Sequence, residues 1–182
     1  MRHGEVYNPS QVLYGRLKRF RLSENGIKQV EKSALFFERQ KLDKIYSSPL
    51  LRARQSAQII ADRVRKKVQI SQLLTEVKLL HQGISLEKYH RELQPFIYDS
   101  KHQNAGQESI DEITIRMMKF VKIINSNHKN ESVLAVSHGD PILILKTHIS
   151  GKKFTWAYKK NNYLSTSRWF KLEIKEGKFT II

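Results

Sequence analysis

The chain has 182 residues, 40% of them hydrophobic and 27% charged, and its formal net charge is +16. This length and composition are typical of a globular domain and exclude a disordered or fibrous chain. The lack of cysteine excludes a disulfide framework, a thiolate zinc site and a cysteine nucleophile, and it fits a cytoplasmic setting. We therefore expect residues 1–182 to form a single domain.

The first half of the chain predicts an alternation of helices and strands. Ser23 can cap a helix that runs to about Gln40, because apolar residues recur on one face of this segment. Residues 43–47 are then expected to form a short strand. A second helix is predicted over residues 51–65, with Arg52 near its first turn and close to the end of the preceding strand.

The second half continues this alternation. Apolar periodicity predicts a helix over residues 108–127, and the continuous apolar run at 133–136 is typical of a buried strand. Another helix is expected to begin near Pro141. Residues 167–174 and 178–182 are predicted to form a hairpin that extends the sheet.

This order of elements predicts an α/β fold, a three-layer α/β/α sandwich around a mostly parallel central sheet. Ligands of such folds bind at the carboxyl ends of the strands. Arg52 and His138 each come just after a predicted strand. We therefore expect both side chains on the same rim of the sheet, although 86 residues separate them.

The positive net charge predicts an anionic partner. The lysines are spread along the chain without a long basic tail, which favours a generally basic surface over a nucleic-acid face, although net charge alone does not exclude nucleic acid. No apolar run approaches the roughly 20 residues of a membrane-spanning helix, so no membrane partner is expected. A homodimer is expected only on the base rate of oligomers.

Three short fragments carry the residue types of a phosphate-binding pocket. They are Arg2–Glu5, Ser48–Ala53 and Ser137–Gly139. A phosphate monoester carries between one and two negative charges at neutral pH, so two guanidiniums and an imidazole can hold its oxygens. Arg2, Arg52 and His138 fit this role. The remaining histidines have no metal-ligand spacing and are assigned no role.

In order and spacing, these fragments resemble the histidine phosphatase superfamily, which includes cofactor-dependent phosphoglycerate mutases and many small phosphatases. The similar segments are Arg2–Glu5, Gly15–Leu17, Leu22–Gly26, Ser48–Ala57, Leu74–Glu76, Gly106–Ser109 with Arg116, and Val136–Gly139. The resemblance covers most of the chain, and it implies the phosphoglycerate mutase-like version of the three-layer fold.

The resemblance also implies a mechanism. His3 would be the nucleophile, which attacks phosphorus in line and carries the phosphoryl group until water removes it. No metal ion or other cofactor is then required. Glu76 would protonate the departing alkoxide and later accept a proton from water, a contribution of about 10² to 10⁴ in rate. The first of these steps requires a raised pKa for Glu76.

The roles of several further residues of the expected site are less closely defined by the sequence. Asn8 stands one residue earlier than the corresponding asparagine of many family members. Arg16 either lines the pocket mouth and binds acidic substrate groups or belongs to a solvated basic loop. The turn at Gly139 can present backbone N–H groups to an anion. Glu76 precedes Val77–Gly83 where the family has a glycine-rich acidic stretch, so a surface carboxylate is the alternative for this residue.

The N-terminus departs from the family pattern. Arg2 and His3 follow Met1 directly, whereas in the family the motif follows a buried strand. We therefore expect the first strand to be missing or truncated, with the nucleophile on a frayed terminus. Either the true start lies upstream of Met1, or the chain is a shortened member with impaired activity. The otherwise intact catalytic set favours an upstream start.

The predicted function is a metal-independent hydrolase of phosphomonoesters. Hydrolysis is favoured over mutase chemistry because only a modest segment between Glu76 and Gly106 could close over the site. The alternatives are a phosphoglycerate mutase-type phosphotransferase and a catalytically impaired protein that binds anions or phosphorylated ligands. The identity of the phosphorylated small-molecule substrate is not readable from the sequence, because variable loops determine it.

Overall fold

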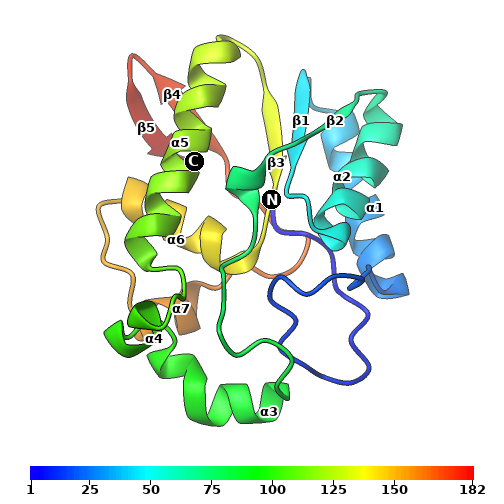
Figure 1. The fold of residues 1–182 in the computed structure, drawn as a ribbon. Helices are drawn as coiled ribbons and strands as arrows, with labels where there is room; N and C mark the ends of the chain where they lie inside the picture. The colour runs from blue at the N-terminus through cyan, green and yellow to red at the C-terminus, as the bar shows by residue number, and fades with distance from the viewer.

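The computed structural model describes residues 1–182 and has a parallel sheet between two layers of helices (Figure 1). The sheet contains β1 (Lys44–Ser47), β2 (Val68–Ile70) and β3 (Val133–Val136), in the order β2-β1-β3. Its helices are α1 (Glu24–Glu38), α2 (Leu51–Val64), α5 (Ile110–Asn127) and α6 (Gly139–Ile149). The predicted three-layer α/β/α fold is confirmed.

Alternation along the strands assigns each face of the sheet to one helix pair. Ile45 and Leu134 belong to an apolar cluster with residues of α1 and α2. Tyr46 and Ala135, one position further along the same strands, pack against the cluster formed by α5 and α6. Successive strand residues point to opposite faces, so a short sheet can bury side chains in two cores.

Shorter helices complete the chain. They are α3 (Leu86–Lys88), α4 (Ser100–Asn104), α7 (Trp156–Asn162), 3₁₀ turns at Gln72–Leu74 and Gln94–Phe96, and a π-helical turn at Tyr89–Leu93. These elements and β2 were not foreseen from the sequence, because each is too short to show a clear apolar period. In Figure 1, α3, α4 and α7 lie below the sheet. None of the helices is both long and apolar enough to cross a bilayer.

The C-terminal hairpin forms, but it does not extend the central sheet. β4 (Leu172–Lys175) and β5 (Lys178–Ile181) pair with each other as a separate antiparallel sheet. Apolar residues of the hairpin, including Ile174 and Phe179, pack against the α5 and α6 cluster. The predicted extension is therefore wrong, because the hairpin covers the helix layer instead.

The N-terminus is ordered, and the expectation of a frayed nucleophile is wrong. The α-amino group of Met1 donates to the carbonyl of Ala135 at 2.8 Å, and His3 N–H donates to Ser137 at 3.1 Å. Arg2 forms a parallel bridge with Ser137, just beyond β3. A missing first strand is not confirmed, since the first three residues themselves continue the sheet beside β3.

A second segment holds the N-terminus from its other side. Arg2 N–H donates to the carbonyl of Arg168 at 2.9 Å, and Ser167 N–H donates to the carbonyl of His3 at 3.0 Å. Met1 and His3 are both buried as a result. The nucleophile candidate is thus fixed by backbone hydrogen bonds on both flanks.

A contact between two glycines joins this N-terminal segment to α1. A Cβ on Gly4 would lie 2.6 Å from the carbonyl oxygen of Gly26, and one on Gly26 would lie 2.1 Å from that of Glu5. Only glycine fits at both positions. Ser23 caps α1 as predicted, and its hydroxyl also donates to Glu5 at 2.6 Å.

Candidate active site

The candidate catalytic residues meet at the carboxyl ends of the strands. Arg52 lies in the first turn of α2 after β1, and His138 directly follows β3. His3 ends the N-terminal segment beside β3. The rings of His3 and His138 are 5.1 Å apart between centroids. The shared rim of Arg52 and His138 is the one that the sequence predicted, whereas the ordered position of His3 beside them was not predicted.

His3 is held in one tautomer. Its Nδ1 lies 2.7 Å from the carbonyl oxygen of Gly4, and because a carbonyl can only accept, Nδ1 carries the proton. Nε2 is therefore unprotonated, and its lone pair accepts a hydrogen bond from Arg52 Nε at 3.1 Å. Burial lowers the pKa of His3 well below its ordinary value, and the charges of Arg52 and Arg2 lower it further. The imidazole is neutral at pH 7.

Arg52 is a buried guanidinium with fixed partners. One terminal nitrogen donates to the carbonyl of Gly15 at 2.7 Å, and the guanidinium carbon lies 4.7 Å from the centroid of the Tyr14 ring. Its only nearby carboxylate is that of Glu76, at 3.9 Å. Burial lowers the pKa of Arg52, and the charge of Glu76 opposes this shift only in part. This side of the pocket is therefore positive.

Arg2 approaches from the C-terminal part of the chain. Its terminal nitrogen donates to the carbonyl of Leu164 at 2.7 Å, and its guanidinium stacks 4.8 Å from the centroid of Tyr163. The Nε of Arg2 is buried without a hydrogen-bond partner. Such a donor can bind an anion without first giving up another bond.

His138 and Ser48 form the next part of the pocket. His138 Nε2 lies 2.7 Å from the hydroxyl oxygen of Ser48, while its buried Nδ1 has no hydrogen-bond partner. Nδ1 is 3.7 Å from the carboxylate of Glu76. Burial lowers the pKa of His138 well below its usual value, and Arg52 and His3 add to this effect.

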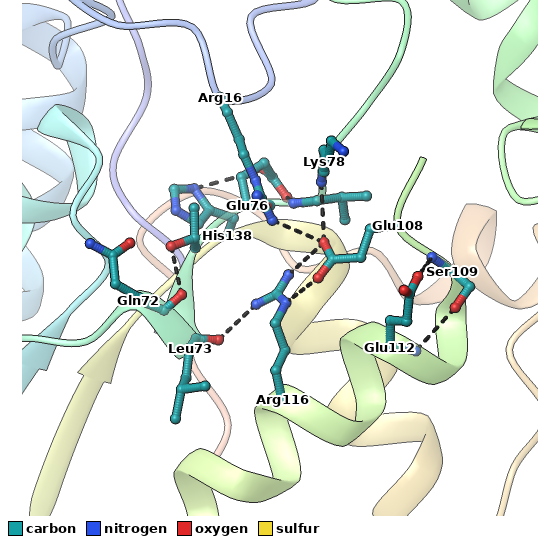
Figure 2. A network of polar contacts seen from close by, with 12 residues as sticks. Arg16, Gln72, Leu73, Glu76, Lys78, Glu108, Ser109, Glu112, Arg116 and His138 are labelled. Atoms are coloured by element: carbon teal, nitrogen blue, oxygen red, sulfur yellow. Dashed lines mark hydrogen bonds and ion pairs between the residues drawn. The ribbon is translucent and has the colours of Figure 1, made fainter. Parts of the chain in front are cut away.

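Glu76 faces His138 and Arg52 with a largely buried carboxylate (Figure 2). Its Oε1 accepts from the backbone N–H of Val77 at 2.9 Å. Burial raises the pKa of Glu76, and the charge of Arg52 only partly opposes this. The direction is the one that a proton donor at neutral pH requires. The Glu76 side chain is only 14% exposed, and its role as proton donor stays a prediction.

Gly139 begins α6 at the pocket and has no room for a side chain. A Cβ at this position would lie 2.1 Å from the hydroxyl oxygen of Tyr163. The start of α6 presents unpaired backbone N–H groups, a common way to bind an anion. The Tyr163 side chain thus lies against Gly139 with its hydroxyl and against the Arg2 guanidinium with its ring.

Asn8 and Arg16 are not aimed at the histidines. Both polar atoms of the Asn8 amide bond to the backbone of Val12, at 2.9 and 3.2 Å. Arg16 donates through Nε to the carbonyl of Glu76 at 2.6 Å and forms a 3.0 Å ion pair with Glu108. A substrate contact by either residue stays a prediction.

Several residues of the site were not singled out from the sequence. Ser48 lies inside the middle motif, so its position before a predicted helix was an available signal. Tyr163 lies just before the predicted hairpin, in a segment for which the sequence predicted no element or role, and nothing in its local sequence marks it. Next to it, Asp140 accepts from Tyr98 at 2.5 Å and from Lys159 at 2.7 Å, in a contact between residues far apart in the chain.

Comparison with known proteins identifies the family. A sequence profile of the histidine phosphatase superfamily (branch 1) matches residues 1–182. The chain belongs to this superfamily. It is an enzyme of the histidine phosphatase type, because similar proteins that carry phosphatase names accompany the match to the profile.

Two named relatives are similar to this histidine phosphatase in sequence. "Phosphoserine phosphatase 1" of Hydrogenobacter thermophilus is 30% identical over 151 residues, which cover 78% of this chain and 71% of that protein. A 2,3-bisphosphoglycerate-dependent phosphoglycerate mutase of Thermoplasma acidophilum is 38% identical over 80 residues, or 43% of this chain and 40% of the mutase. Both phosphatases and mutases are therefore similar to it.

Solved structures share the fold. The protein YhfR of Bacillus stearothermophilus superposes with a TM-score of 0.84 at 20% sequence identity, over 99% of this chain and 92% of YhfR. At this identity the likeness concerns the backbone. It agrees with the phosphoglycerate mutase-like arrangement of sheet and helices described above.

Proposed function

We propose that this histidine phosphatase hydrolyses phosphate monoesters through a phosphohistidine on Nε2 of His3. The observation that supports this proposal is the fixed tautomer of His3. The contact from Nδ1 to Gly4 leaves the lone pair of Nε2 facing Arg52 inside a buried, positive pocket. A neutral imidazole beside a phosphate-binding guanidinium is suited to in-line attack on phosphorus.

In the first step, Nε2 of His3 forms a bond to phosphorus as the ester P–O bond breaks. Arg2, Arg52 and His138 bind the phosphoryl oxygens and offset their negative charge. The leaving oxygen takes a proton from the carboxyl group of Glu76. The raised pKa of Glu76 favours the protonated carboxyl group that this step requires.

In the second step, water attacks phosphorus and the P–N bond breaks, with its electron pair returning to Nε2 of His3. The carboxylate of Glu76 accepts the proton that the water loses. Inorganic phosphate leaves, and both residues return to their starting protonation states. Neither step requires a metal ion, because the guanidiniums supply the positive charge.

Phosphorylated small molecules fit this chemistry, and transfer to water is the favoured outcome. The relative named phosphoserine phosphatase makes phosphoserine the first substrate to test. The relative named phosphoglycerate mutase makes transfer to a second hydroxyl the competing outcome. Inorganic phosphate is released only in hydrolysis, so its yield per substrate consumed distinguishes the two reactions.

The test is phosphate release from phosphoserine and from an aryl phosphate in the presence of a metal chelator. The wild-type chain is expected to turn over, and His3→Ala is expected to fall by roughly 10⁴-fold or more, as when other catalytic nucleophiles are removed. His148→Ala removes an exposed histidine and is the matched control. Alkaline quenching during turnover should trap phosphate on the peptide that contains His3.

Two results would contradict the proposal. One is activity that disappears with the chelator, and the other is a His3→Ala variant as active as His148→Ala. A folded wild-type chain that releases no phosphate from any phosphomonoester would also contradict it.

A further inference from the structure

Glu76 lies on a segment without regular structure. Residues 75–84 belong to no helix or strand, and they follow the 3₁₀ turn Gln72–Leu74. His3, Arg52 and His138 are instead held by strands and helix starts. A proton donor must be held within about half an ångström of its working position, so contacts from elsewhere have to fix the Glu76 segment.

The carboxylate of Glu108 gathers three partners beside this segment (Figure 2). It forms a fork with Arg116, with Oε1 2.5 Å from Nε and Oε2 3.1 Å from the terminal nitrogen. Its Oε2 also accepts from Arg16 at 3.0 Å and from the backbone N–H of Lys78 at 3.1 Å. The side chain of Glu108 is only 12% exposed, so solvent screens these contacts weakly.

Each partner of Glu108 is tied to the segment that carries Glu76. Arg116 donates to the carbonyl of Leu73 at 2.7 Å, before Glu76, and Arg16 donates to the carbonyl of Glu76 itself at 2.6 Å. After Glu76, Lys78 exchanges a second hydrogen bond with Glu108, from Glu108 N–H to the carbonyl of Lys78 at 3.1 Å. The segment is therefore held before, at and after the proton donor.

The geometry points to Glu108 as the positioning residue of the proton donor Glu76. It does not touch the phosphate pocket, and it acts by orienting the two arginines and the backbone around Glu76. This inference rests on the proposed function, because it assigns Glu108 to the step in which Glu76 protonates the leaving group. It also explains the position of the Arg16 side chain, which donates to both the carbonyl of Glu76 and the carboxylate of Glu108.

Loss of the Glu108 carboxylate leaves two partly buried guanidiniums without their shared anion. Unpaired buried charges are strongly unfavourable, so Arg116 and Arg16 would turn toward solvent and release the carbonyls of Leu73 and Glu76. Glu76 would then reach the leaving oxygen less often. Binding of the phosphoryl group by Arg52 and His138 would change little, because neither residue contacts Glu108.

Leaving-group dependence separates this role from a general loss of structure. An alkyl phosphate such as glycerol 2-phosphate needs a proton on its departing oxygen, whereas 2,4-dinitrophenyl phosphate releases a stable anion without one. The value of kcat/KM covers the steps up to leaving-group departure. We expect Glu108→Gln to lower kcat/KM by about 10- to 100-fold for the alkyl ester and by less than about threefold for the dinitrophenyl ester.

Glu112→Gln is the matched control. Glu112 lies four residues after Glu108, in the first turn of α5, and closes the capping box with Ser109. Glutamine also fills this role. This variant should leave both kcat/KM values unchanged. Glu108→Asp, whose shorter side chain keeps the charge, should recover part of the alkyl-ester activity.

Equal losses on the two esters, or no loss on either, would overturn the positioning role. Thermal unfolding of each variant shows whether it is folded, and the ratio of the two kcat/KM values is independent of the fraction folded. An inactive wild-type chain would contradict the proposed function itself, whereas an active wild type with an unaltered Glu108→Gln ratio would contradict only the present inference.

Discussion

The proposed phosphate side and the proposed leaving-group side of the site are built in different ways. On the phosphate side, His3, Arg52 and His138 sit at the ends of strands or in the first turn of a helix, and backbone hydrogen bonds fix them. On the leaving-group side, Glu76 sits on irregular chain that side chains from α5 and the N-terminal loop hold in place. Regular structure fixes one half of the site, and a network of charges fixes the other.

This difference suits the two tasks. Binding a phosphoryl group requires several fixed donors, which strand ends provide without further adjustment. Proton transfer to varied leaving groups involves a single carboxyl, and loops can change around it while the phosphate side stays intact. The two sides should therefore respond differently to mutation, and each prediction below separates them.

Removing Arg52 should produce the largest of these effects and should not discriminate between leaving groups. We expect Arg52→Ala to lower kcat/KM by about 10³-fold for both the alkyl and the dinitrophenyl ester, since both lose the same phosphoryl contact. Arg54→Ala, an exposed arginine on the same helix, is the control and should change neither value. A loss confined to the alkyl ester would erase the distinction between the two sides.

Glu76→Gln should show the opposite pattern. The amide cannot supply the proton, so kcat/KM for the alkyl ester should fall by about 10²-fold, while the value for the dinitrophenyl ester falls less than about threefold. Steady-state kinetics on both esters measure this directly. If the dinitrophenyl ester suffers equally, Glu76 acts on phosphate binding and belongs to the other side of the pocket.

The smallest effect concerns stability against pH, and it belongs to the phosphate side. His3 and His138 have pKa values well below their usual 6.5 in the folded chain, so they stay neutral when the unfolded chain binds protons. The contribution of these histidines to the free energy of unfolding is therefore complete above pH 6.5. It decreases as the pH falls below 6.5, by up to about 1.4 kcal/mol per pH unit for each histidine.

Urea unfolding at pH 7.5 and 5.5, in a buffer free of phosphate, measures this loss. His3→Gln combined with His138→Gln should reduce the pH dependence, whereas the exposed pair His90→Gln and His148→Gln should retain all of it. The remaining part is expected from the α-amino group of Met1, because burial lowers its pKa to about 5. Identical pH dependence in the two double variants would show that these buried histidines are not the source.

The sequence predicted the shared rim of Arg52 and His138 because the signals that place these two residues are local. The run at 133–136 followed by His138, and the helix start at Arg52 after a short strand, place both residues on one rim by the rule for parallel strands. The helix α1 was also within reach, since Ser23 occupies the predicted N-cap position. The helix α5 begins two residues after its predicted start at residue 108.

The rest depends on contacts between distant residues, which a single sequence does not reveal. The approach of the Tyr163 hydroxyl to Gly139 has no periodicity and no local motif. Glu108 and Glu76 lie in two motifs that resemble the family, but neither motif shows that Glu108 contacts the segment that carries Glu76. The same reason explains the error at the N-terminus. Met1–His3 lack a strand pattern, yet their backbone groups pair with Ala135, Ser137, Ser167 and Arg168.

The pairing of residues 1–3 with residues 167–168 also has a consequence for synthesis of the chain. The backbone that holds one flank of His3 is synthesised about 165 residues after His3 itself. At typical rates of elongation this interval is roughly 10 to 30 seconds. A nascent chain that stops short of Leu164 carries every catalytic side chain, yet it lacks the backbone that seats Arg2 and His3.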